Sequence, residues 1–178
     1  VRYGTFNCPN VDGTSLVYTG YAAGTHFTHT GGGVGPICLP DPKKLSVQDP
    51  DEIMPGFQNL GRLYGSEYET DAITPLNHVH NLDVPCTVCL VSGRTTKITI
   101  PGRTSCPSGW TQEYKGFLMS GHHAHQSPTE FVCMDEELEV FRGSGINANG
   151  QLFYTVEIAH DSHLCAPFGC NGKEVACV

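Results

Sequence analysis

Short apolar runs separated by turn residues recur along the chain, and each run predicts a strand. The runs are rich in β-branched and aromatic residues and are bounded by Gly, Pro, Asn or Asp; they cover residues 15–21, 86–91, 95–100, 130–133 and 152–158. Between them, the pattern predicts a loop over residues 30–36, a polar irregular excursion over residues 41–54 and a single helical turn over residues 135–139. The chain is therefore predicted to be mostly β.

This pattern is duplicated within the chain. Residues 13–29 (GTSLVYTGYAAGTHFTH) align without gaps with residues 109–125 (GWTQEYKGFLMSGHHAH), at a shift of 96 positions. Five of the 17 positions are identical, against about one expected from background composition. The identities pair Gly13 with Gly109, Tyr18 with Tyr114, Gly20 with Gly116, His26 with His122 and His29 with His125.

The flanks of the two copies also agree. Cys8-Pro9 precedes the first copy as Cys106-Pro107 precedes the second, and a cysteine closes each copy, Cys38 and Cys133. Further on, GRLY at 61–64 resembles GQLF at 150–153, and each is followed by a histidine pair and then a cysteine pair. We therefore predict two similar β-rich halves, residues 1–100 and 101–178, that form one compact unit with pseudo-twofold symmetry.

Composition narrows the class of protein. The chain has 178 residues, of which 39% are hydrophobic and only 16% charged, so we expect an ordered domain with its own core. The net charge is −8 and no basic stripe exists, which argues against nucleic acid and anionic membranes as partners. No apolar run approaches the roughly 20 residues that span a bilayer.

Nine cysteines and a single Cys-x-x-Cys (Cys86, Cys89) favour disulfides over zinc fingers, and therefore a secreted, extracellular protein. By equivalence of the halves, we predict the disulfides Cys8–Cys38 and Cys106–Cys133. Because nine is odd, one thiol is free or pairs with another chain. The remaining five cysteines have no predicted partners: Cys86, Cys89, Cys165, Cys170 and Cys177.

A further series of motifs spans nearly the whole chain. It comprises VRYG at 1–4, GYAAGTHFTHTGGG at 20–33, LYGSEYE at 63–69, VPCTVC at 84–89, IPGRTSCPSGWTQEYKGFLMSG at 100–121, TEFVC at 129–133 and LFYTVE at 152–157. Together they resemble the non-collagenous region of the sponge-type short-chain collagens, that is, the short-chain collagen C4-like or spongin-like proteins of invertebrates. That region is distantly similar to the duplicated C-terminal domain of basement-membrane collagen, which has two β-rich, disulfide-bonded halves. The resemblance implies a homo-oligomer, a trimer or a multiple of it.

The chain departs from that family in ways that bear on function. It has no Gly-X-Y tract and so forms no collagen triple helix itself. His160 stands where the family pattern has a cysteine, and Cys170 is an addition. The segment His160-Asp161-Ser162-His163 is therefore the place where a function outside the family is expected.

The nine histidines are the main chemical candidates. Eight of them form the close pairs His26/His29, His78/His80, His122/His125 and His160/His163. Imidazole ligates Zn, Cu, Ni or Fe, and we predict that the first three pairs bind a transition metal, Zn or Cu. In a strand, His78 and His80 would point to the same side and could share an ion, whereas residues three apart would need a turn to converge.

Three hypotheses follow for the function. The first is a secreted matrix or mucus-type protein that self-assembles and binds a metal or another small ligand through its histidines. The second is an enzyme recruited onto this scaffold, such as an oxygenase or a luciferase-type oxidoreductase, with His160, Asp161 and His163 as the catalytic groups. The third is a purely structural module whose histidines only pack. Without a metal, histidine clusters could instead serve pH-dependent assembly, since they titrate near neutral pH.

Overall fold

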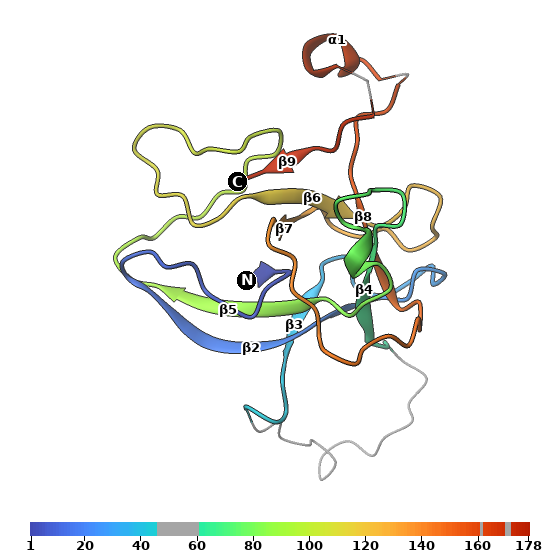
Figure 1. The fold of residues 1–178 in the computed structure, drawn as a ribbon, viewed down its shortest axis with the longest axis horizontal. Helices are drawn as coiled ribbons and strands as arrows, with labels where there is room; N and C mark the ends of the chain where they lie inside the picture. The colour runs from blue at the N-terminus through green and yellow to red at the C-terminus, as the bar shows by residue number, and fades with distance from the viewer. Residues whose placement is uncertain (46–60, 161, 170–171) are drawn as a thin grey trace.

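The protein is mostly β, as predicted. The computed structural model describes residues 1–45, 61–160, 162–169 and 172–178. The strands are β1 (Arg2–Tyr3), β2 (Thr14–Gly24), β3 (Ile37–Pro40), β4 (Tyr64–Glu69), β5 (Pro85–Val91), β6 (Gly116–Ser120), β7 (Val132–Asp135), β8 (Gln151–Thr155) and β9 (Ala176–Cys177). A 3-10 turn covers Asn77–Val79, and the short helix α1 (Cys165–Phe168) projects away from the strands (Figure 1).

The described strands form one continuous sheet that closes on itself. Its order is β3-β2-β4-β8-β6-β7-β1-β5, and β5 pairs back onto β2. The largest fully buried side chains come from both halves, with Tyr68 directly opposite Phe153 where β4 and β8 run parallel. Met119 and Met134 from the second half complete the centre of the core.

The duplication seen in the sequence reappears in the strand pairing. In the first half Ala22 lies opposite Cys38, and in the second half Leu118 lies opposite Cys133. The β2–β5 and β6–β9 pairs match in the same way, because Gly20 lies opposite Cys86 and Gly116 lies opposite Cys177. Tyr64 and Tyr154 are also equivalent, because Gly24 lies opposite Tyr64 and Ser120 lies opposite Tyr154. The two halves nevertheless meet with an offset: Tyr154 of β8 lies opposite Glu69 of β4, five residues beyond Tyr64.

The tyrosine of each copy has one and the same role. Tyr18 Oη donates to the carbonyl oxygen of Cys38 at 3.0 Å, and Tyr114 Oη donates to that of Cys133 at 3.1 Å. Each hydroxyl is thus satisfied at a half-buried site while its ring packs on the sheet. Residues 20–24 of β2 and 116–120 of β6 therefore occupy equivalent places, whereas Thr14 to Thr19 belong to β2 and residues 110–115 lie outside the described strands.

The predicted disulfides are wrong in their pairing. The bonds among described cysteines are Cys8–Cys89, Cys38–Cys86 and Cys133–Cys177. Cys38 and Cys133 are equivalent, as expected, but each bonds to the strand on the far side of β2 or β6 because the sheet brings Cys86 and Cys177 next to them. Cys165 is also disulfide-bonded, whereas the Cys106 thiol is free.

Several local predictions also need correction. Residues 95–100 form no regular strand, since the segment that links the halves is mostly exposed, and residues 135–139 form no helical turn. The run at 86–91 is confirmed as β5, and residues 30–36 are a loop. Of the predicted excursion, residues 46–54 lie outside the described part of the chain. Among the described residues, no helix is long and apolar enough to cross a membrane.

Candidate functional site

Two histidines and a tyrosine stack together in the first half. The loop that follows β2 places the ring of His26 5.0 Å from the ring of His29, and both rings contact Tyr64 of β4 edge-on, at 5.0 and 5.4 Å. These three residues are called the first cluster below.

The second half builds the same arrangement. After β6, the ring of His122 lies 5.1 Å from that of His125, and both rings contact Tyr154 of β8 edge-on, at 5.1 and 5.5 Å. His122, His125 and Tyr154 are called the second cluster. The neighbouring His123 also lies against His122, with ring centroids 4.3 Å apart.

One type of turn creates both clusters. The backbone N–H of His29 donates to the carbonyl oxygen of His26, and that of His125 donates to His122. The first imidazole of each turn also accepts a hydrogen bond at Nδ1 from the backbone two residues on, Thr28 for His26 at 3.3 Å and Ala124 for His122 at 3.2 Å. These local bonds explain why histidines three residues apart come together here instead of pointing to opposite faces of a strand.

The two clusters lie side by side. The N–H of Phe27 donates to Gly150, and the N–H of Ser127 donates to Phe27, so the two loops are tied to each other by backbone hydrogen bonds. The ring of Phe27 lies 4.7 Å from that of His125. Both loops lie with β4 and β8 at one side of the sheet (Figure 1). The Phe27 ring also stacks on His26 at 4.9 Å, so it lies between the two clusters and joins them.

Burial sets the charge state of the second cluster. Desolvation, followed by the neighbouring His122 and His123, lowers the pKa of His125. Desolvation, followed by the carboxylates of Glu69 and Asp71, raises the pKa of Tyr154. At neutral pH this cluster therefore presents a neutral imidazole and a protonated phenol.

The geometry bears directly on metal binding. In a neutral ring that accepts at Nδ1, the proton sits on Nε2, so His26 and His122 have no outward lone pair in this state. A metal held by two imidazoles must also lie in both ring planes, yet His26 and His29 are stacked with only 28° between their planes. Among the described residues, no group of three or more His, Cys, Asp or Glu side chains is placed to hold a metal ion. Metal binding at these pairs therefore requires the rings to turn, and it stays a prediction.

His78 and His80 do not share a face. The predicted strand is instead the 3-10 turn Asn77–Val79. His78 Nδ1 contacts the carbonyl oxygen of Pro75 at 3.0 Å, while His80 Nδ1 accepts from the N–H of Thr70 and lies 3.4 Å from a carboxylate oxygen of Glu69. Each imidazole thus has its own backbone partner, and a shared ion is not favoured by this arrangement.

The predicted catalytic segment stands apart from the clusters. His160 and His163 are exposed on the excursion that leads into α1, and Asp161 lies outside the described residues. In the described part of the chain, neither histidine stacks on another histidine or on a tyrosine. The enzyme hypothesis stays a prediction without geometric support.

The sequence comparison missed the two tyrosines of the clusters. It matched Tyr64 with Phe153, whereas the strand pairing and the ring contacts make Tyr64 equivalent to Tyr154. Shifting that alignment by one residue would have matched the two tyrosines, because YGSE at 64–67 and YTVE at 154–157 both begin with tyrosine and end with glutamate.

No protein-family model matches the chain, and no solved structure matches it. The resemblance to the short-chain collagens of invertebrates therefore stays a prediction.

Proposed function

We propose that the protein is a secreted, self-associating component of an extracellular matrix or mucus-type material, and that its two histidine–tyrosine clusters bind a metal ion or another small ligand. Disulfides support the extracellular setting, since such bonds persist in oxidising compartments. Cys38–Cys86 and Cys133–Cys177 lie in equivalent places in the two halves. A durable, covalently braced domain suits a structural material.

Self-association is supported by apolar side chains left exposed beside the clusters. Val34, Ile37, Leu39 and Phe131 are exposed on β3 and on the two joined loops, and we call them the association patch. Glu130 N–H donates to the carbonyl oxygen of Val34, which ties the Phe131 side of the patch to the Val34 side. None of the four side chains carries a charge, so a second copy could cover them without burying a charge of the patch itself.

β3 is an edge strand, unlike β7, its counterpart in the second half. β7 has neighbours on both sides, β6 and β1, whereas β3 pairs only with β2 among the described strands. An edge strand with exposed apolar side chains is a natural contact for another chain. The exposed apolar face of this edge strand is the single observation on which the proposal rests, and we expect a second copy of the chain to cover it.

Sedimentation of wild-type protein and of Phe131→Ser tests self-association. Phe131 is 65% exposed, so the substitution leaves the monomer folded, and we expect the association constant to fall about tenfold or more because a phenylalanine contact is worth roughly 1.5–3 kcal/mol. Phe168→Ser is the matched control, because Phe168 is 66% exposed on α1, away from the patch. A wild type that stays monomeric, or two variants that behave alike, contradicts the proposal. The measured mass also tests the expected trimer.

Calorimetric titration with Zn²⁺ and Cu²⁺ tests the clusters. We expect the wild type to bind metal, the double variant His29→Ala/His125→Ala to lose this binding, and His160→Ala/His163→Ala to keep it. Within the clusters, Nδ1 of His26 and of His122 accepts a backbone N–H, so His29 and His125 are the histidines whose Nδ1 is not occupied in this way. Binding lost in the second variant instead would move the site to the His160 segment. Absence of any metal binding would contradict the metal part of the proposal and leave the association test unaffected.

A further inference from the structure

A cavity unrelated to the histidine clusters opens where the two halves are linked. It has a volume of about 330 Å³ and lies between the connecting segment 94–99 and the loop 106–114. The end of β5 forms another wall, through Cys89 of the Cys8–Cys89 disulfide and Val91. The volume is within the range of sites that enclose small molecules, roughly 300–1,000 Å³.

The lining is mainly apolar. Val91, Ile98, Trp110 and Val178 contribute to it, together with Pro9 from the N-terminal segment. Trp110 and Ile98 are each 43% exposed, so a ligand bound against them would remove apolar surface from water.

The charges of the wall oppose the charge of the protein. The whole chain has 18 acidic residues against ten Lys and Arg, yet the charged side chains of the wall are Arg2, Arg94 and Lys97 against the single carboxylate side chain of Glu113. Arg2 is neutralised outside the cavity by Asp135. Glu113 neutralises Arg94 at 2.9 Å, so the positive charge of Lys97 remains without a counter-ion among the described residues.

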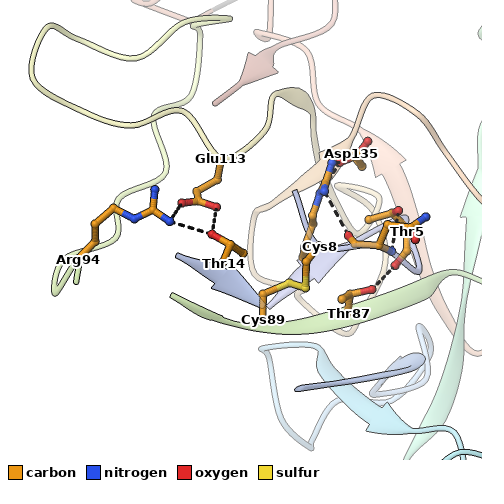
Figure 2. Close-up of a disulfide and its surroundings, with 10 residues drawn as sticks. Thr5, Cys8, Thr14, Thr87, Cys89, Arg94, Glu113 and Asp135 are labelled. Carbon is orange, nitrogen blue, oxygen red and sulfur yellow. Dashed lines mark hydrogen bonds and ion pairs between the residues drawn. A yellow bond between two sulfur atoms is a disulfide. The ribbon is translucent and has the colours of Figure 1, made fainter. Parts of the chain in front are cut away.

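Arg94 also has an unused donor. Its Nη2 reaches both Glu113 and the hydroxyl of Thr14, as Figure 2 shows beside the Cys8–Cys89 disulfide. Its Nε is buried and lacks a hydrogen-bond partner within the described part of the chain. A buried guanidinium N–H without an acceptor is unfavourable, and an anionic group entering the cavity would meet both this arginine and Lys97.

We propose that this cavity binds a small, mainly apolar or aromatic molecule that carries an acidic group. The apolar wall provides the contact area, while Lys97 and Arg94 select the anion over neutral and cationic analogues. This ligand site is independent of the histidine–tyrosine clusters and of the association patch.

The chain provides two reporters of the cavity. Trp110 is the single tryptophan of the sequence, and it lies in the wall. Cys106, the free thiol of the described residues, lies in the same wall. A bound molecule should therefore change the fluorescence of Trp110 and shield Cys106 from alkylation.

The test uses two dyes that differ by one sulfonate, 1-anilinonaphthalene-8-sulfonate and its uncharged analogue N-phenyl-1-naphthylamine. We expect the anionic dye to bind about tenfold more tightly, to quench Trp110 by energy transfer and to slow alkylation of Cys106 by iodoacetamide, as one charge pair near a protein surface allows. Lys97→Glu should remove this preference. Lys43→Glu is the matched control, since it changes the net charge equally at an exposed lysine outside the cavity.

Three results would overturn the proposal. These are equal affinity for the two dyes, dye binding that leaves Cys106 alkylation unchanged, and equal effects of the two lysine substitutions. Thr96→Phe, which places a ring in the wall from an exposed position, should abolish dye binding while the protein stays folded by circular dichroism. Retained binding in that folded variant would also contradict the proposed site.

Discussion

The two halves share their strand pairing but differ in how they are closed. In the first half β2 is flanked by β3 and β5, and in the second half β6 is flanked by β7 and β9, with the same register around Gly20 and Gly116. Yet Cys8 is bonded to β5, whereas its counterpart Cys106 keeps a free thiol. The backbone plan is thus duplicated, while the covalent bracing is not.

This difference coincides with the positions of the surfaces described above. The loop that follows Cys8 is held to β5 by a disulfide, while the loop that follows Cys106 lines the cavity and exposes Trp110. β1 pairs with the outer side of β7, while β3 has no second strand beside it in the described part of the chain. Each half therefore has one surface that is covered in the other half: the first half exposes the apolar side chains of β3, and the second half exposes the cavity beside Trp110. These two surfaces are where we propose binding.

The largest expected effect concerns the two equivalent disulfides. Cys133→Ala/Cys177→Ala should lower the free energy of unfolding by about 4 kcal/mol, because the bond closes a loop with a sequence separation of 44. Cys38→Ala/Cys86→Ala should cost about 1 kcal/mol less, because its loop lies inside the larger Cys8–Cys89 loop, which still restricts the unfolded chain. Guanidinium unfolding without reductant measures both values. A larger loss in the first half would mean that nesting has no effect.

The next effect concerns two equivalent glycines. A Cβ at Gly20 would collide with the carbonyl oxygen of Leu39, and a Cβ at Gly116 would collide with that of Met134. We expect Gly20→Ala and Gly116→Ala to cost about 3 kcal/mol each, since the neighbouring strand must move.

Gly65→Ala is the control for the glycine pair. It lies in β4, where nothing stands within 4 Å of the added Cβ, and its cost should be below about 1 kcal/mol. Thermal unfolding compares the three variants. If Gly116→Ala were as mild as Gly65→Ala, the close approach of strands would be a property of the first half alone.

The sequence predicted the duplicated plan because the residues that the backbone requires recur at fixed spacing. Glycine is needed at position 20 because β3 approaches β2 there, and at position 116 because β7 approaches β6 there. Tyr18 and Tyr114 donate to equivalent carbonyl oxygens, so the identities at these positions reported true equivalence. The disulfide partners could not be obtained in this way. Cys38 meets Cys86 only because β2 brings β3 and β5 to its opposite sides, and such long-range pairing leaves no trace in local sequence.

The sequence predicted which histidines form the candidate site but not how their rings come together. The histidine pairs stood out through their repetition, but their rings converge through turns, which a strand pattern does not reveal. The alignment slipped by one residue at Tyr64 because the shift between the halves falls from 96 at β2 to 90 at β4, as the intervening loops differ in length. The β-branched residues 95–100 satisfied strand propensity, but in the described part of the chain only Ile100, at their end, pairs with another segment, through Val178.

A smaller effect concerns Tyr114, whose ionisation should lower the free energy of unfolding at alkaline pH. Burial raises the pKa of Tyr114 to about 12, while the nearby Arg2 opposes this and Asp135 adds to it. The unfolded state ionises first, near pH 10, so stability that is complete below pH 10 is lost as the pH rises to about 12. We expect this loss to be about 2 kcal/mol, below the full two-unit value because the ring is partly exposed.

Tyr114→Phe isolates that contribution. The variant should lose about 1 kcal/mol at pH 7, where the hydrogen bond to Cys133 is removed, and should then decline less than wild type between pH 10 and 12. Urea unfolding across this pH range provides the measurement. Parallel pH curves for the two proteins would show that Tyr114 is not the group that titrates.

The smallest effect concerns the cysteine that lacks a counterpart bond. Cys106→Ser should change the free energy of unfolding by less than about 0.5 kcal/mol, because the thiol is partly exposed and forms no disulfide. The equivalent change in the first half, Cys8→Ser/Cys89→Ser, opens a loop with a sequence separation of 81 and should cost about 4 kcal/mol. Titration of native wild-type protein with a thiol reagent should label Cys106, and the serine variant should lose this label. A destabilised Cys106→Ser would mean that the second half depends on this residue for its bracing as the first half depends on Cys8, and the contrast between the halves would no longer hold.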